Sequence, residues 1–137
     1  MSVLKFKPTS FTWQHIGRKI ADFVRSSRKY LTFPVPVSSG QVYNLSVGDA
    51  ETIVNFNGDI AQPITFNIDA GPALIIGDKV LFFVKASGSS RVVTFSDNVF
   101  TNVSSNPGGH TFTAVTTDTK IVTLIFDGTN FHGIDYF

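Results

Sequence analysis

The sequence predicts an all-β fold, an antiparallel β-sandwich or small jelly-roll-like barrel, preceded by a basic N-terminal arm with one amphipathic helix. After Pro34 and Pro36, short stretches rich in Val, Ile, Thr and Phe alternate with Gly, Asn, Asp and Pro, as in strands joined by turns. Before Pro34 the chain is basic, and its apolar residues recur at helical spacing. We therefore divide the 137 residues into an arm, residues 1–32, and a β-sandwich body, residues 33–137.

The charge of the chain is divided unevenly between these two parts. Residues 1–31 hold seven Lys or Arg against the single acid Asp22, whereas residues 32–137 hold four against nine acids. Such a split is typical of a basic arm attached to an acidic body. We therefore expect the arm and the body to face different surroundings.

Residues 12–31 are predicted to form the amphipathic helix, which Pro34 prevents from continuing. Its apolar positions fit within an arc of about 100°, as one face of a helix requires. The apolar residues expected to anchor the arm are Trp13, Ile16, Ile20, Phe23 and Val24. The basic residues expected to support them are Arg18, Lys19, Arg25, Arg28 and Lys29.

Four surroundings for this helix stay open. It could pack against its own body or a sister subunit, insert into a larger assembly, contact nucleic acid, or lie on a membrane surface. Basic residues beside a tryptophan suit each of the last three, so the sequence alone does not separate them.

Nine strands are predicted in the body, and two of its turns carry strong hairpin signals. Because Asn-Gly and Asp-Gly reach positive φ at low cost, we expect the strand over 51–57 to turn back near Gly58 and the last two strands to pair. The predicted strands are 41–47, 51–57, 63–68, 79–86, 91–96, 98–103, 110–115, 119–126 and 130–136.

Two of these strands are apolar on both faces. In residues 120–126, Val122, Leu124 and Phe126 share one face and Ile121 and Ile125 the other, and residues 80–84 are likewise apolar throughout. One face of each strand is expected to meet the core. The other must be covered by a further element or another subunit.

A short phrase recurs in the body, as Ile64-Thr65-Phe66-Asn67 and as Val93-Thr94-Phe95-Ser96. Since no further match accompanies it, we interpret the phrase as two similar strand ends and not as a duplication.

The sequence offers no set of residues that indicates catalysis or metal binding. Cysteine is absent, and the histidines His15, His110 and His132 lie far apart in the chain. The acids at predicted turns, where bonds to nearby backbone explain them, are Asp69, Asp78, Asp118 and Asp127. We expect no enzyme, no catalytic residue, no cofactor and no metal site.

A carbohydrate-binding, lectin-like module is the alternative from another functional class. Exposed aromatic rings on a β-body could stack on sugars, and the candidates are Tyr43, Phe131, Tyr136 and Phe137. Because phenylalanine far outnumbers tyrosine and tryptophan, packing in the core or between subunits is the favoured interpretation of these rings.

The stretch from about Thr52 to Phe137 resembles the β-domains of bacteriophage virion proteins such as head fibres, spikes, tail-fibre modules and small capsid-vertex proteins. The segments that carry the resemblance are an Asn-Gly turn followed by residues 64–66, then 77–82, 91–95 and the closing pattern 120–131. The arm lies outside the resemblance.

This resemblance implies a non-enzymatic structural protein of the virion, located at the capsid surface or vertex as a spike, head fibre or penton-like component. Such proteins form homo-oligomers, often trimers or pentamers, and bind the major capsid protein or other virion proteins. The arm would then attach the body to the capsid, with contact to the genome or an internal membrane left open. A host-surface glycan would be a further partner of the body.

Overall fold

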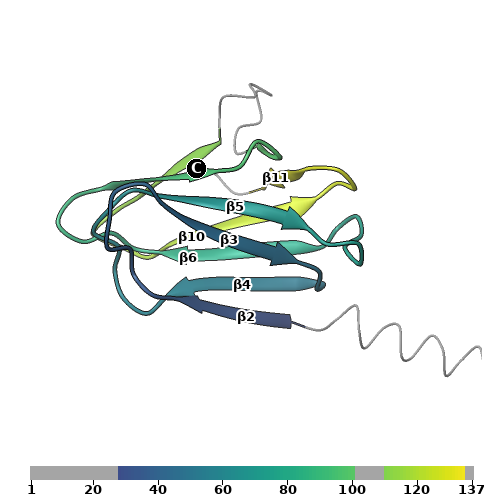
Figure 1. The fold of residues 1–137 in the computed structure, drawn as a ribbon, viewed down its shortest axis with the longest axis horizontal. Helices are drawn as coiled ribbons and strands as arrows, with labels where there is room; N and C mark the ends of the chain where they lie inside the picture. The colour runs from purple at the N-terminus through teal and green to yellow at the C-terminus, as the bar shows by residue number, and fades with distance from the viewer. Residues whose placement is uncertain (1–27, 101–109, 135–137) are drawn as a thin grey trace, which may run out of the picture.

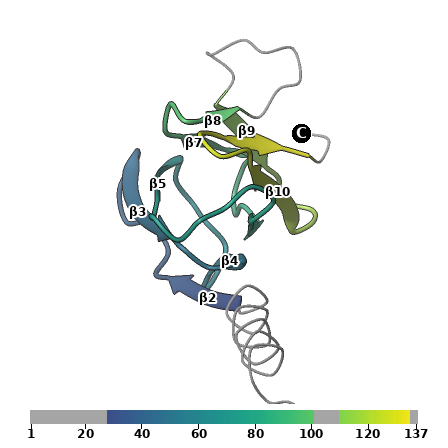
Figure 2. The same cartoon turned by 90° about the vertical axis from the view of Figure 1, so that its right-hand side faces the viewer.

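The computed structural model describes residues 28–100 and 110–134, and within these ranges the fold is all-β with no helix. The described strands form a six-stranded and a four-stranded sheet that face one another (Figures 1 and 2). The six-stranded sheet contains β2 (Arg28–Phe33), β4 (Glu51–Phe56), β6 (Lys79–Val84), β10 (Lys120–Phe126), β11 (Phe131–Gly133) and β8 (Val99–Phe100), in that order. The four-stranded sheet contains β3 (Gln41–Val47), β5 (Ile64–Ala70), β7 (Arg91–Phe95) and β9 (Thr111–Ala114).

The chain changes sheet after each strand from β2 to β9. As a result β2, β4 and β6 run parallel in one sheet, and β3, β5 and β7 run parallel in the other. In this part of the body the chain winds as a superhelix, which we call the coil. Each winding, or turn of the coil, adds one strand to each sheet. The antiparallel pairs β6–β10, β10–β11 and β7–β9 and the parallel pair β11–β8 complete the two sheets.

The expectation of an antiparallel sandwich is therefore correct for the all-β class but wrong for the pairing, because both sheets are mixed. The hairpin expected at Gly58 is also wrong: β4 pairs in parallel with β2 and β6, and the chain beyond Gly58 crosses to the other sheet. The backbone N–H of Asn57 donates to the carbonyl of Phe33, and its side-chain oxygen accepts from the N–H of Val35. These bonds tie the loop to the previous turn of the coil.

The closing hairpin is confirmed. β10 and β11 are antiparallel, with Phe126 opposite Phe131, and Gly128 in the connecting turn has a φ of +106°. Phe126 is 6% exposed and lies in the core, as its alternation with Val122 and Leu124 predicts.

The prediction that the helix extends to residue 31 is wrong, because Arg28–Phe33 forms the strand β2. Leu31 and Phe33 point to the core and are half-buried, whereas Tyr30 and Thr32 are exposed, so the local alternation has the period of a strand. β2 also pairs along its whole length with β4. The boundary drawn between residues 32 and 33 falls inside this strand, and residues 12–27 of the predicted helix lie outside the described residues.

Aromatic rings form the centre of the core between the sheets. The recurring phrase lies in neighbouring parallel strands, with Phe66 directly opposite Phe95. Tyr43 lies opposite Phe66 on the other side, so three turns of the coil place aromatic rings in one row. The row is therefore produced by in-register stacking of the coil, and its ring centroids are 5.8 and 6.0 Å apart.

Candidate functional site

Of the residues predicted to anchor the arm, the structure describes Arg28 and Lys29, both exposed on the edge strand β2. Nε of Arg28 lies 2.6 Å from a carboxylate oxygen of Glu51 on β4. A hydrogen bond with Tyr30 and the charge of Glu51 raise the pKa of Arg28. Arg28 is thus paired within the body. The residues outside the described ranges are Trp13, Ile16, Ile20, Phe23, Val24, Arg18, Lys19 and Arg25.

The face of the six-stranded sheet that points away from the core, which we call the outer face, is rich in apolar residues. The strand register places Tyr30, Ile53 and Leu81 in one row across β2, β4 and β6. Phe83 and Ile121 lie opposite each other in the neighbouring row. Tyr30 and Ile121 are 67% and 51% exposed, and the other three are half-buried.

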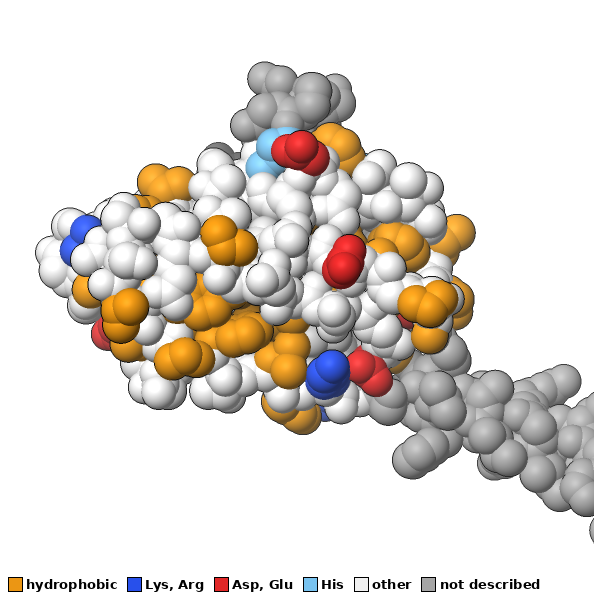
Figure 3. All heavy atoms as spheres, viewed as in Figure 1, with side chains coloured by type: hydrophobic (Ala, Val, Ile, Leu, Met, Phe, Trp, Pro, Cys, Tyr) orange, Lys and Arg blue, Asp and Glu red, His pale blue; other side chains and the backbone are white. Residues whose placement is uncertain are grey.

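The outward side of the four-stranded sheet has a different character. Polar residues alternate outward along β3 and β5, and the Asn67 amide donates a 3.1 Å hydrogen bond to the Asn44 oxygen. Figure 3 is viewed from this side and shows hydrophobic side chains in separate groups, the largest of them below the centre, among backbone and side chains of other kinds. Two exposed valines also lie on this sheet, Val42 on β3 and Val92 on β7. The apolar outer face of the six-stranded sheet is therefore the stronger candidate for an interface.

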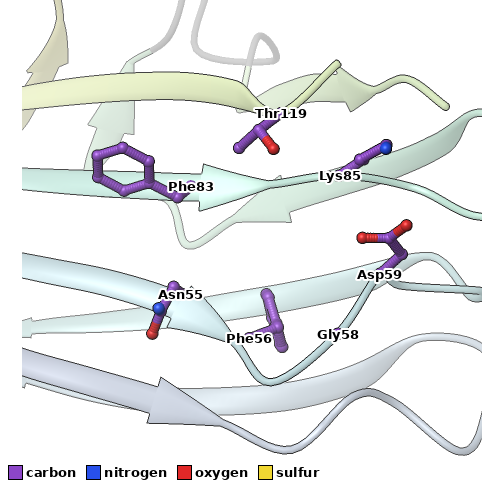
Figure 4. A pocket seen from close by; sticks show the side chains of 7 residues that line it. All are labelled: Asn55, Phe56, Gly58, Asp59, Phe83, Lys85 and Thr119. Atoms are coloured by element: carbon purple, nitrogen blue, oxygen red, sulfur yellow. The ribbon is translucent and has the colours of Figure 1, made fainter. Parts of the chain in front are cut away.

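Residues of the outer face continue into a pocket at the end of β4 and β6. The pocket has a volume of about 230 Å³. Figure 4 shows its lining, which comes from β4, the loop after β4, β6 with the residue that follows it, and the residue before β10. The lining residues are Asn55, Phe56, Gly58, Asp59, Phe83, Lys85 and Thr119.

The Asp127 carboxylate organises the turn of the closing hairpin. One oxygen accepts hydrogen bonds from the backbone N–H groups of Asn130 and Thr129, at 2.7 and 2.8 Å. The other lies 2.5 Å from Nε2 of His132, whose ring stacks against Phe100. The two backbone hydrogen bonds are the main reason that the pKa of Asp127 falls from 3.8 to about 2. The carboxylate thus acts within its own turn, as the sequence predicts.

Because the pKa of Asp127 is depressed in the folded protein, its contribution to stability is present above about pH 4 and is lost as the pH falls to 2. We expect Asp127→Ala to lower the free energy of unfolding at pH 7 by about 1 kcal/mol, since solvent screens this exposed group. Urea unfolding at pH 7 and pH 2 measures the difference, which should nearly vanish at pH 2. An equal loss at both values would contradict this role for the charge.

Two aromatic residues considered for sugar stacking are enclosed in the core. Tyr43 is 5% exposed and its hydroxyl donates to the carbonyl of Pro34, and Phe131 is 0% exposed. Packing in the core, the favoured interpretation, is therefore confirmed for both. Tyr136 and Phe137 lie outside the described residues.

Within residues 28–100 and 110–134, no three His, Cys, Asp or Glu residues are grouped so that they could hold a metal ion. The same ranges contain no helix long and apolar enough to cross a membrane.

Comparison of the chain with protein-family models, with curated proteins and with solved structures finds no match. The surfaces described above and the resemblance in the sequence are therefore the features that indicate a function.

Proposed function

We propose that the chain is a non-enzymatic structural protein of a bacteriophage virion, a spike, head-fibre or vertex component. Its body forms a homo-oligomer, and its arm attaches it to the capsid. The observation that carries the proposal is the apolar outer face of the six-stranded sheet, because the opposite face of that sheet already encloses the core.

The outer face has the properties expected of a contact between copies. Tyr30, Leu81 and Ile121 come from three different strands, so the apolar surface extends across the sheet. Complete burial of a large apolar side chain contributes roughly 1.5–3 kcal/mol, and several such residues act together in a symmetric assembly. A closed trimer or pentamer would cover this face in every copy.

The virion context comes from the resemblance of residues 52–137 to phage β-domains, and the division of charge agrees with it. A basic arm and an acidic body suit a subunit that contacts an assembly at one end and solvent at the other.

The oligomer is tested by placing a charge on the outer face. We expect the wild-type chain to form a stable oligomer and Leu81→Lys to be monomeric, because a lysine in the centre of the interface would be buried without a partner. Light scattering after size-exclusion chromatography measures the mass, and circular dichroism checks the fold. Asn67→Lys, an exposed position on the outward side of the other sheet, is the matched control and should remain oligomeric.

Attachment is tested by removing residues 1–27, which leaves β2 complete. The shortened chain should fold and oligomerise normally but fail to copurify with virions. Incorporation at the normal copy number would show that the body itself attaches to the virion.

For the oligomer, a wild-type chain that stays monomeric at high concentration would contradict the proposed homo-oligomer.

A further inference from the structure

The connection between β5 and β6 presents a run of apolar residues at one end of the sandwich. We call this run the tip, and it consists of Pro72, Ala73, Leu74, Ile75 and Ile76. Each of these residues except Leu74 is exposed, and Ile75 and Ile76 are 53% and 73% exposed. Single apolar side chains are common on protein surfaces, but a continuous exposed run is typical of a contact site.

Hydrogen bonds and one buried side chain hold the tip in place. Leu74 is 8% exposed and joins the middle of the tip to the core. The Asp78 carboxylate accepts from the N–H of Ile75 at 2.9 Å, and the Asp78 N–H donates to the carbonyl of Ile75 at 3.1 Å. The N–H of Gly77 donates to the carbonyl of Phe126 at 2.9 Å. Because the backbone that carries the two isoleucines is already ordered, a partner can cover them with little loss of conformational entropy.

The tip lies at the end of the sandwich where the arm joins the body. The strand register places Arg28, Glu51 and Lys79 in one row, at the start of β2, β4 and β6. Neighbouring strands lie about 4.8 Å apart, so the chain enters β6 about 10 Å from the first residue of β2. Figure 1 shows this end on the right, where β5 ends and β2 begins. A partner that the arm binds would therefore lie within reach of the tip.

The charges beside the tip favour a protein as its partner. Asp69 is exposed on β5 shortly before the tip, and Asp127 is exposed in the hairpin turn beside Ile76. Asp49 lies in the neighbouring loop, which accepts a hydrogen bond from the N–H of Lys79. These three carboxylates outnumber the one ammonium, that of Lys79. Nucleic acid and an anionic membrane would be repelled by them, whereas an apolar protein pocket with a neutral or basic rim would not.

We propose that the tip is a second attachment contact, which inserts Ile75 and Ile76 into an apolar pocket of the same virion protein that the arm binds. The inference rests on the proposed function, since it takes the arm as the first contact. The tip belongs to neither sheet, so an oligomer formed through the outer face does not require it. Two contacts on one subunit raise the effective concentration of each for its site, so the loss of either should weaken attachment strongly.

The proposal is tested in virions that carry the full-length chain with changes at the tip. Ile76→Asp, and the uncharged double variant Ile75→Ser with Ile76→Ser, should each lower the number of copies retained per virion at least tenfold. Retention is measured after a wash at about 1 M salt, which screens the charges of the arm so that the apolar contact decides the result. Val37→Asp is the matched control, because Val37 is 87% exposed in the loop at the opposite end of the sandwich, and it should be retained like the wild type. Circular dichroism and light scattering check that every variant is folded and oligomeric.

Photocrosslinking in the same virions identifies the partner. A benzophenone amino acid in place of Ile76 should crosslink to the same virion protein as one in place of Phe23 in the arm. No crosslink from position 76, or a crosslink only to another copy of this chain or to lipid, would overturn the proposal. Wild-type retention of both tip variants would overturn it as well.

The chain that lacks residues 1–27 separates the two attachments. If this chain is lost from virions while the tip variants are retained, the tip proposal fails and attachment by the arm stands. If the tip variants are lost while the shortened chain is retained, attachment by the arm fails and the tip stands as the contact.

Discussion

Replacing Phe66 by alanine is expected to lower the free energy of unfolding by about 3–5 kcal/mol, the usual loss when a fully buried aromatic side chain is removed from a core. Phe66 is 0% exposed and lies between the two sheets. Its ring centroid is 4.8 Å from that of Phe82 on the six-stranded sheet and 6.0 Å from that of Phe95 on its own sheet. The further ring neighbours are Phe33, Tyr43 and Phe56.

The expected loss is large because this site cannot easily collapse. Its neighbours belong to consecutive turns of the coil and are held by parallel ladders on both sides of β5, so a cavity would remain. Such a loss is a large share of the 5–15 kcal/mol that stabilises an ordinary domain. Urea unfolding followed by circular dichroism measures it.

Asp69→Ala provides the matched control, since Asp69 is exposed on the same strand. It should change the free energy of unfolding by less than about 0.5 kcal/mol. If Phe66→Ala were equally mild, the aromatic row would not be the centre of the core.

Strand positions could be predicted from the sequence because they depend on local alternation. The strand over 41–47 has the predicted bounds, and its burial alternates residue by residue between the core and solvent. The closing hairpin was equally predictable, because Asp127 and Gly128 determine a tight turn through their own backbone and side-chain chemistry.

Strand partners could not be predicted in the same way, because parallel pairing joins segments that are distant in the sequence. Asn57-Gly58 is a valid turn signal, but a turn that leads back to the same sheet and one that crosses to the other sheet use similar residues. The recurring phrase did contain the missing information. Phe66 and Phe95 occupy equivalent positions in two turns of the coil. Interpreting the phrase only as two similar strand ends does not imply this equivalence.

The candidate sites differ in how far they could be predicted from the sequence. The apolar residues on both sides of residues 80–84 and 120–126 predicted an outward apolar surface, and Leu81, Phe83 and Ile121 do lie on the outer face. The pocket was not predictable, because it arises where the ladder between two distant strands is interrupted. At β2, Leu31 fitted both a helical and a strand period, and pairing with β4 decides between them.

Replacing Gly128 by valine is expected to lower the free energy of unfolding by about 1–3 kcal/mol, the usual cost of a strained backbone conformation. Gly128 has a φ of +106°, a conformation that β-branched residues rarely adopt. A Cβ at this position would also lie 3.3 Å from Cγ1 of Ile76. The strain falls on the turn that the Asp127 carboxylate holds, so the pairing of β10 with β11 is expected to weaken first.

Hydrogen exchange in the variant should therefore increase at residues 124–133 before it increases in the parallel part of the coil. Gly48→Val is the matched control, because Gly48 lies in a turn without a positive φ and a Cβ there would meet no atom within 4 Å. The control should shift the urea midpoint much less than Gly128→Val does. Equal shifts in the two variants would contradict the role of backbone conformation at Gly128, and exchange that increases uniformly would show that the hairpin does not open separately from the rest of the body.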